Sequence, residues 1–351
     1  TMVLFWYLRI DYFWFMILVT GGTGLVGSHL LYFLSREHSE LRAIYRRTSD
    51  LNGVKKVFSY YGGDSESFFE RIRWVEADLL DLSALEDAFP DVTHVYHCAA
   101  LVSFITSDYQ MMRRVNIEGT TNIVNLCITH KVKKICYVSS VAAIENRAEG
   151  EITDESDNWT STAGKSGYAI TKYGAEMEVW RASQEDIPVV IVNPGVILGS
   201  GPWHKGSGTL FSRVDAGLPF YTTGVTGFVD VQDVVRIMIS LMESEIQNER
   251  FILVAENLTY RDVLFKIAES LNKRKPSIKL NRWMTEFIWR FELLKSKITL
   301  TPPLLTKHTA RSSVSNHPFS SKKIIDALNF SFTKMDDCIN RVVKHYKNTN
   351  R

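Results

Sequence analysis

The sequence predicts an α/β fold in which a doubly wound parallel sheet carries a smaller, mainly C-terminal α+β lobe. Short apolar runs alternate with helical patterns from Met16 onward, as such a sheet requires. A glycine-rich turn joins the first apolar run to the first helical pattern. The 351 residues, of which 45% are hydrophobic, are enough to build one large core and a second lobe.

Six short runs of β-branched or apolar residues are predicted to be strands. They cover residues 17–20, 41–45, 72–76, 94–98, 134–139 and 188–193. Helical patterns lie between them, among others at 27–35, 82–88, 109–131 and 168–184. Because a crossover follows each strand, the right-handed βαβ rule favours a single sheet with a Rossmann-type topology.

The pattern of the chain changes after Gly199, where GSGPWHKGSG predicts a loop. We therefore expect a Rossmann domain at 16–199, with returning segments near 226–254, and a second lobe at 200–225 and 255–351. Residues 1–15 form an apolar N-terminal extension, shorter than the about 20 residues that a membrane-spanning helix needs. We expect Met16 to be the natural start, or the extension to pack on the domain, and we expect no membrane partner.

The charge and the cysteines argue against a nucleic-acid-binding protein and against a metal-binding protein. Forty-one basic and 39 acidic residues give a net charge of +2, which offers no electrostatic footprint for nucleic acid. A small-molecule partner fits this charge better. The four cysteines have neither CxxC nor metal-ligand spacing, so we expect no metal, and reduced thiols in a cytoplasmic protein.

The turn in VTGGTGLVGSHL places Gly21, Gly24 and Gly27 between a strand and a helix. One glycine suits a tight backbone conformation, one lets N–H groups approach a pyrophosphate, and one lets helix and strand pack closely. These features predict a dinucleotide-binding turn; an ordinary strand–turn–helix is the alternative.

Residues after the second and third strands are candidates for contact with the adenosine end of a dinucleotide. Arg46 and Arg47 stand where an acidic residue would bind the ribose of NAD, and no acid follows before Asp50. We therefore expect NADP(H) rather than NAD(H), with two solvated arginines as the alternative. Asp78 could accept from the adenine amino group or cap the next helix, a role that suits Asp81 better.

Tyr168 and Lys172 lie four residues apart in SGYAITKYGAE, which puts both side chains on one helical face. A nearby cation favours the ionised form of a phenol, whose ordinary pKa is ~10. YxxxK is a common spacing, so taken alone the pair would be interpreted as an ordinary pair on a helix surface. Ser139 and Ser140, however, end a strand at the sheet edge where such folds bind ligands, and a hydroxyl there can hold a substrate oxygen against Tyr168. Helix capping is the alternative role for these serines.

Together these motifs resemble the extended short-chain dehydrogenases/reductases, also called the NAD-dependent epimerase/dehydratase family. The resemblance covers nearly all of 16–346 and rests on GGTGLVG, ADLLD, HCAA, RRVNIEGTTNIV, YVSS, YAITKYGAE, NPGVILGSGP and FVDVQDV. It implies that Tyr168 is the general acid/base, that Ser140 is the catalytic serine, and that Lys172 binds the nicotinamide ribose and lowers the tyrosine pKa. It also implies that Asn116 supports the site; a structural amide in mid-helix is the alternative.

The resemblance further implies which residues contact the cofactor, with 16–199 as the NAD(P)-binding domain and the second lobe as the substrate-binding part. The implied cofactor residues are Gly21, Thr23, Gly24, Leu25, Val26, Gly27, Arg46, Arg47, Asp78, Leu79, Ala99, Ala100, Tyr168, Lys172, Pro194, Gly195 and Val196. It also suggests a homodimer through the helices at 109–131 and 168–184.

The predicted activity is NAD(P)-dependent reduction of an aldehyde or ketone, or oxidation of the alcohol. The segment 203–221 carries Lys205 and Arg213 but is otherwise apolar and glycine-rich, so we favour a fairly apolar substrate over a sugar nucleotide. A nucleotide-sugar epimerase or dehydratase with tightly bound NAD is the first alternative. A regulatory module that binds NADP(H) without turnover is the second, and the intact set of Ser140, Tyr168 and Lys172 argues against it.

An aromatic stripe occurs in NRWMTEFIWRFELLKSK, where Trp283, Phe287, Phe291 and Leu294 recur at helical spacing. Most such stripes are core, and we predict that role here. The alternatives are a lid over an apolar substrate, a dimer surface or a membrane-surface face.

Overall fold

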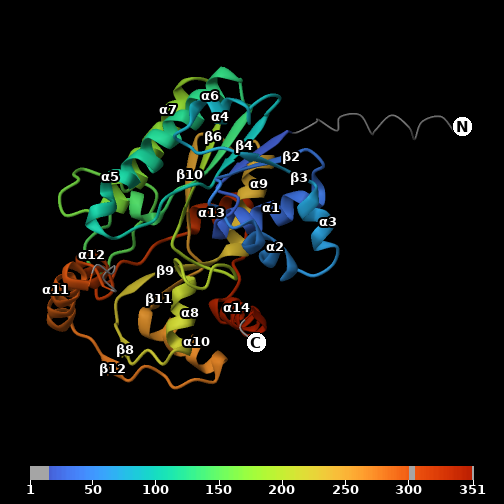
Figure 1. Ribbon diagram of the computed structural model, residues 1–351. Coiled ribbons are helices and arrows are strands. Elements are labelled where there is room, and N and C mark those ends of the chain that lie inside the picture. Colours follow the sequence, from blue (N-terminus) through green and yellow to red (C-terminus); the bar gives the residue numbers. More distant parts are fainter. Residues whose placement is uncertain (1–15, 300–304, 350–351) are drawn as a thin grey trace, which may run out of the picture.

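The computed structural model describes residues 16–299 and 305–349, and the predicted N-terminal extension, 1–15, lies outside them. Its main sheet has seven parallel strands in the order β10-β6-β5-β4-β1-β2-β3 (Figure 1). The strands are β1 (Ile17–Thr20), β2 (Leu41–Tyr45), β3 (Ile72–Glu76), β4 (His94–His97), β5 (Lys134–Val138), β6 (Val189–Pro194) and β10 (Glu249–Leu253). The six strands predicted from the sequence lie within one residue of their expected bounds, which confirms the Rossmann-type α/β fold.

Helices cover both faces of this sheet. One face is packed by α1 (Leu25–Glu37), α2 (Leu51–Ser59), α3 (Ser65–Glu70) and α9 (Val231–Glu243). The other is packed by α4 (Leu82–Glu86), α6 (Gly119–Thr129) and α7 (Gly167–Gln184). The predicted helix at 109–131 is divided into α5 (Tyr109–Met112), the π-helical η2 (Arg113–Glu118) and α6. No helix was predicted between β2 and β3, where α2 and α3 lie; Gly53, Gly62 and Gly63 interrupt the helical pattern of this segment.

The second lobe is built around a three-stranded sheet in the order β11-β9-β7. Its strands are β7 (Val196–Leu198), β9 (Val225–Asp230) and β11 (Glu256–Thr259), and β8 (Phe220–Tyr221) pairs with β12 (Ile278–Lys279). The helices after β7, apart from α9, are α8 (Gly208–Asp215), α10 (Tyr260–Leu271), α11 (Arg282–Thr299), α12 (Lys307–Ser312), α13 (Lys322–Leu328) and α14 (Met335–Thr349). A separate apolar core, with Phe211, Phe228, Ile267 and Ile339 among its members, holds this lobe together.

The aromatic stripe lies on α11 and is exposed, so the prediction that it is core is wrong. Trp283 and Phe287 are each 71% exposed. The helical spacing places these side chains on one face, but it carries no information about what that face meets. Neither α11 nor any other helix in the described part of the chain has the length and apolar character needed to cross a membrane.

Candidate active site

The glycine turn connects β1 to α1 at the carboxyl end of the main sheet. Gly21 has a φ of +67°, a left-handed conformation that glycine adopts without strain. A Cβ on Gly27 would overlap the carbonyl oxygen of Gly21, so helix and turn pack at a distance that needs glycine. Gly24 caps α1 without a side-chain hydrogen bond, which leaves the first N–H groups of the helix able to bind a phosphate. The turn therefore fits the pyrophosphate of a dinucleotide.

A cavity of about 360 Å³ lies where β2 and β3 end. It is lined by Arg46, Arg47, Thr48, Glu76, Ala77, Asp78, Asp81 and Ala84. Thr23 of the glycine turn donates to the Ser49 hydroxyl at 3.4 Å, and the same hydroxyl accepts from the N–H of Arg46 at 3.0 Å. These hydrogen bonds connect the glycine turn to Arg46, which lines the cavity. The lining fits the adenosine end of a dinucleotide whose pyrophosphate lies at the turn.

The acidic residues around this cavity have distinct local partners. Asp50 accepts from the N–H of Gly53 at 2.9 Å and caps α2. Asp81 caps α4 through the N–H of Ala84 at 3.1 Å, which confirms its predicted capping role. Asp78 accepts from the N–H of Leu80 at 2.9 Å and lines the cavity.

Ser140 and Tyr168 come together at the carboxyl end of β5. Ser140 directly follows this strand, and its hydroxyl accepts from the N–H of Ala142 at 3.1 Å, so it also caps the short helix η3 (Val141–Ala143). Tyr168 lies in the first turn of α7, which Ser166 caps. Burial raises the pKa of Tyr168, and a hydrogen bond with Ser140 opposes that rise. The resemblance implied a lowered pKa, whereas burial acts in the opposite direction here.

Lys172 is buried one turn further along α7. Its ammonium donates to the hydroxyl of Tyr137 at 2.9 Å and to the carbonyl of Val138 at 2.7 Å. Burial lowers the pKa of Lys172 to about 7, and the charge of Glu176 acts in the opposite direction. The two contacts fix the lysine against β5, between the helix and the strand that carry the other candidate residues.

Asn116 lies in the π-helical segment η2 and is 1% exposed. Its amide exchanges two hydrogen bonds with the backbone of Leu101, at 2.7 and 3.0 Å, and donates to the hydroxyl of Thr171 at 3.1 Å. Thr171 stands beside Lys172 on α7. Asn116 therefore ties the loop after β4 to the helix that carries Tyr168 and Lys172, and π-helical turns are frequent at functional sites.

The remaining predicted cofactor residues follow the carboxyl ends of neighbouring strands. Leu79 comes after β3, Ala99 and Ala100 come after β4, and 194–196 joins β6 to β7. The N–H of Ala99 donates to the hydroxyl of Thr20 at 3.2 Å, which fixes the β4 turn to β1. Because parallel strands end at one edge, these residues lie along the same edge as the glycine turn.

Glu176, Asn193 and Arg250 form a buried polar network that the sequence analysis missed. The carboxylate of Glu176 accepts from Ser139 at 2.5 Å and from the Asn193 amide at 2.9 Å, and it pairs with Arg250 at 3.1 Å. Asn193 also donates to the carbonyl of Ser140 at 3.1 Å. The spacing of 168, 172 and 176 could have identified Glu176, since all three positions share one helical face.

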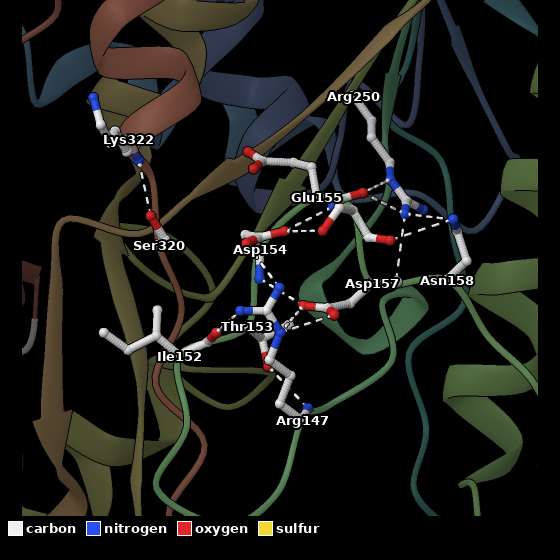
Figure 2. Close-up of polar contacts among 11 residues, drawn as sticks. Arg147, Ile152, Thr153, Asp154, Glu155, Asp157, Asn158, Arg250, Ser320 and Lys322 are labelled. Atoms are coloured by element: carbon white, nitrogen blue, oxygen red, sulfur yellow. Dashed lines mark hydrogen bonds and ion pairs between the residues drawn. The ribbon is translucent and has the colours of Figure 1, made fainter.

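Arg250 reaches from β10 into the loop that follows η3 (Figure 2). Its guanidinium donates to the carbonyl of Glu155 at 2.7 Å and to the side-chain oxygen of Asn158 at 2.9 Å. Arg147 pairs with two carboxylates of the same loop, at 2.9 Å each, from Asp154 and Asp157. The loop beyond Ser140 is thereby attached to the edge strand of the sheet.

The buried ammonium predicts a pH-dependent contribution to stability. Burial lowers the pKa of Lys172 from its ordinary value of 10.5 to about 7. Between these two pH values, the folded chain has therefore lost a proton that the unfolded chain still holds. Stability should therefore increase as pH rises through this window. The free energy of unfolding is measured across it for the wild type and for Lys172→Met. The free energy of unfolding of the wild type should increase relative to that of the variant as pH rises. A difference between the two that does not change with pH would contradict the prediction.

Comparison with known proteins identifies the family. The model of the NAD dependent epimerase/dehydratase family matches residues 17–255. A putative dihydroflavonol 4-reductase of Synechocystis sp. is 27% identical over 81% of each chain. Cinnamoyl-CoA reductase 1 of Petunia hybrida is 26% identical over 94% of this chain and 91% of its own. The crystal structure of a Thermus thermophilus UDP-glucose 4-epimerase complex with NAD shares the fold, with a TM-score of 0.72 at 22% identity, over 94% of this chain and 98% of that one.

The matched segment contains the glycine turn, Ser140, Tyr168 and Lys172, and it covers more than half of the chain. The observed fold and the family model therefore agree with the motifs. The chain belongs to the NAD-dependent epimerase/dehydratase family of extended short-chain dehydrogenases/reductases and is an NAD(P)-dependent oxidoreductase.

Proposed function

We propose that this protein reduces an aldehyde or a ketone with NADPH. The observation that carries the proposal is that Ser140 follows β5 and that Tyr168 and Lys172 lie on α7, at the sheet edge that also carries the glycine turn. Ser140 holds the substrate oxygen, Tyr168 gives a proton to that oxygen, and Lys172 binds the nicotinamide ribose. Bound NADPH supplies the hydride. Oxidation of the alcohol uses the same groups in reverse.

The surroundings of Tyr168 support an apolar substrate. The ring of Phe104 meets the ring of Tyr168 edge to face at 5.5 Å between centroids and is 41% exposed. Val102, in the same loop, is 56% exposed. An exposed aromatic side chain next to the proton donor, with an exposed aliphatic side chain in the same loop, favours a ligand that removes both from water. The Synechocystis and Petunia relatives are both named reductases, which agrees with a carbonyl substrate.

Arg46 and Arg47 support NADP(H) over NAD(H), because both are exposed and line the cavity at the end of β2. Replacing both with alanine should weaken NADPH binding by about tenfold or more and leave NADH binding unchanged, since a 2′-phosphate loses its charge-assisted partners. Titration followed by nucleotide fluorescence measures both affinities. The matched control is Lys55→Ala with Lys56→Ala, which removes two exposed cations from α2. Equal losses in the two variants, or a preference of the wild type for NADH, would reject the assignment.

A substrate screen tests the proposed activity. The purified protein is incubated with NADPH and panels of aldehydes, ketones and sugar nucleotides. Consumption of NADPH with apolar carbonyls supports the proposal. Turnover of sugar nucleotides with NAD retained through purification would favour the epimerase or dehydratase alternative. Cofactor binding without turnover in any panel, unchanged by Tyr168→Phe, would favour the regulatory module.

Two further expectations are part of the proposal. We place the protein in a reducing compartment such as the cytoplasm, because all four cysteines are unpaired and three of them, Cys127, Cys136 and Cys338, are buried. A homodimer through α6 and α7 stays a prediction, and light scattering tests it.

A further inference from the structure

The helix α11 presents an apolar face to solvent. At about 100° per residue, the side chains of Trp283, Phe287, Phe291 and Leu294 fall within an arc of roughly 80°. Trp283 and Phe287 are 71% exposed, and Phe291 and Leu294 are 59% exposed. A contiguous stripe of this size on a protein surface marks a site that another surface covers.

The opposite side of α11 holds the helix on the protein. Thr285 lies roughly 160° around the helix from the centre of the stripe and is 1% exposed. Glu286 accepts from Arg311 of α12 at 2.8 Å, and α11 packs beside α12 at the edge of the second lobe (Figure 1). Of the described side chains of α11, none belongs to an apolar core cluster. The stripe therefore faces away from the body of the protein.

The segment that leads into α11 and contains it is strongly basic. From 271 to 299 it contains eight lysines and arginines and two glutamates, a formal charge of +6, whereas the whole chain carries +2. Five exposed cations follow one another without an intervening acid: Lys273, Arg274, Lys275, Lys279 and Arg282. Two of the five pair with acids from neighbouring elements, Lys273 with Asp215 at 2.9 Å and Lys275 with Glu269. Arg290 and Lys295, also exposed, flank the stripe on α11 itself and pair with Glu286 and Glu292 of the same helix.

We propose that α11 docks on the surface of an anionic phospholipid bilayer, with its stripe between the headgroups and the acyl chains. Tryptophan, phenylalanine and leucine on one face with lysine and arginine beside them are the composition of interfacial helices. The basic segment complements anionic headgroups. A second copy of the chain fits less well, because a symmetric contact would bring two +6 segments together. This inference is independent of the proposed reaction, and it replaces our expectation of no membrane partner.

Co-sedimentation with vesicles tests the proposal. The full chain should bind vesicles of phosphatidylcholine with phosphatidylserine, bind phosphatidylcholine alone more weakly, and lose binding as salt increases. The double variant Trp283→Ser, Phe287→Ser should bind at least about tenfold more weakly. The matched control is Leu82→Ser with Ile325→Ser, which removes two apolar side chains exposed by 53% and 41% on α4 and α13. Thermal melting of each variant checks that the fold is kept.

A second variant identifies the contact directly. Trp283→Phe should still bind, but quenching of tryptophan fluorescence by brominated acyl chains should decrease, because Trp283 is the ring in the stripe that emits. Binding that the double serine variant retains would overturn the proposal. The proposal would also be overturned if the wild type were a dimer, the double serine variant were a monomer, and neither bound vesicles. That result would assign the face to a second copy of the chain.

Discussion

Replacing Tyr168 with phenylalanine is expected to lower kcat/KM for carbonyl reduction by about 10²–10⁴, the usual contribution of a general acid. The change removes the hydroxyl and leaves the ring that contacts Phe104 at 5.5 Å. Because burial raises the pKa of Tyr168, the hydroxyl holds its proton at neutral pH, as a proton donor must. Steady-state kinetics with the best carbonyl substrate from the screen measures the loss.

The control for this variant is Tyr32→Phe, which removes the hydroxyl of a buried tyrosine on α1. Its kcat/KM should match the wild type, and NADPH should bind both variants as tightly as it binds the wild type. An equal loss in the two variants would assign the effect to packing, and full activity of Tyr168→Phe would remove Tyr168 from the proposed role.

Replacing Arg250 with methionine is expected to destabilise the protein by about 3–5 kcal/mol, the range found when a buried ion pair loses one partner. Glu176 is 0% exposed, so its carboxylate would keep no counter-charge and could not recover full hydration. The loop after Ser140 would also lose its bonds from Arg250 to Glu155 and Asn158. The free energy of unfolding in urea measures the change.

Two further variants show whether the effect belongs to the buried pair. Arg147→Met breaks the half-exposed pairs with Asp154 and Asp157 and should cost much less. The double variant Glu176→Leu, Arg250→Met removes both charges and should recover part of the lost stability. If Arg147→Met proved as costly as Arg250→Met, the buried pair would not be the source.

The strands and the fold class could be predicted because central parallel strands such as β1, β5 and β6 are buried along their whole length and are mostly apolar. The division of 109–131 by a π-helical turn could not, because Arg113–Glu118 keeps the side-chain pattern of an ordinary helix. The exposure of Trp283 and Phe287 could not be predicted either. Periodicity shows which side chains share a face, whereas burial depends on the neighbouring elements.

In the candidate site, too, some features could be predicted from the sequence and others could not. The positions of Tyr168 and Lys172 follow from local spacing on one helix, and those of Ser140 and the glycine turn follow from strand ends. The pair of Glu176 with Arg250 joins residues 74 apart, through the pairing of β6 with β10, which no local pattern encodes. The raised pKa of Tyr168 could not be predicted either, because it depends on how the folded chain buries the side chain.

The ribosome makes Glu176 before its partner Arg250, which lies 74 residues later. Until that arginine emerges, the nascent chain holds the carboxylate without its counter-charge, and the open edge of β6 is exposed to other strands. All the proposed catalytic residues have been translated by then, yet the sheet beneath them is incomplete. Synthesis of β10 therefore supplies both the missing counter-charge and the strand that covers the edge of β6.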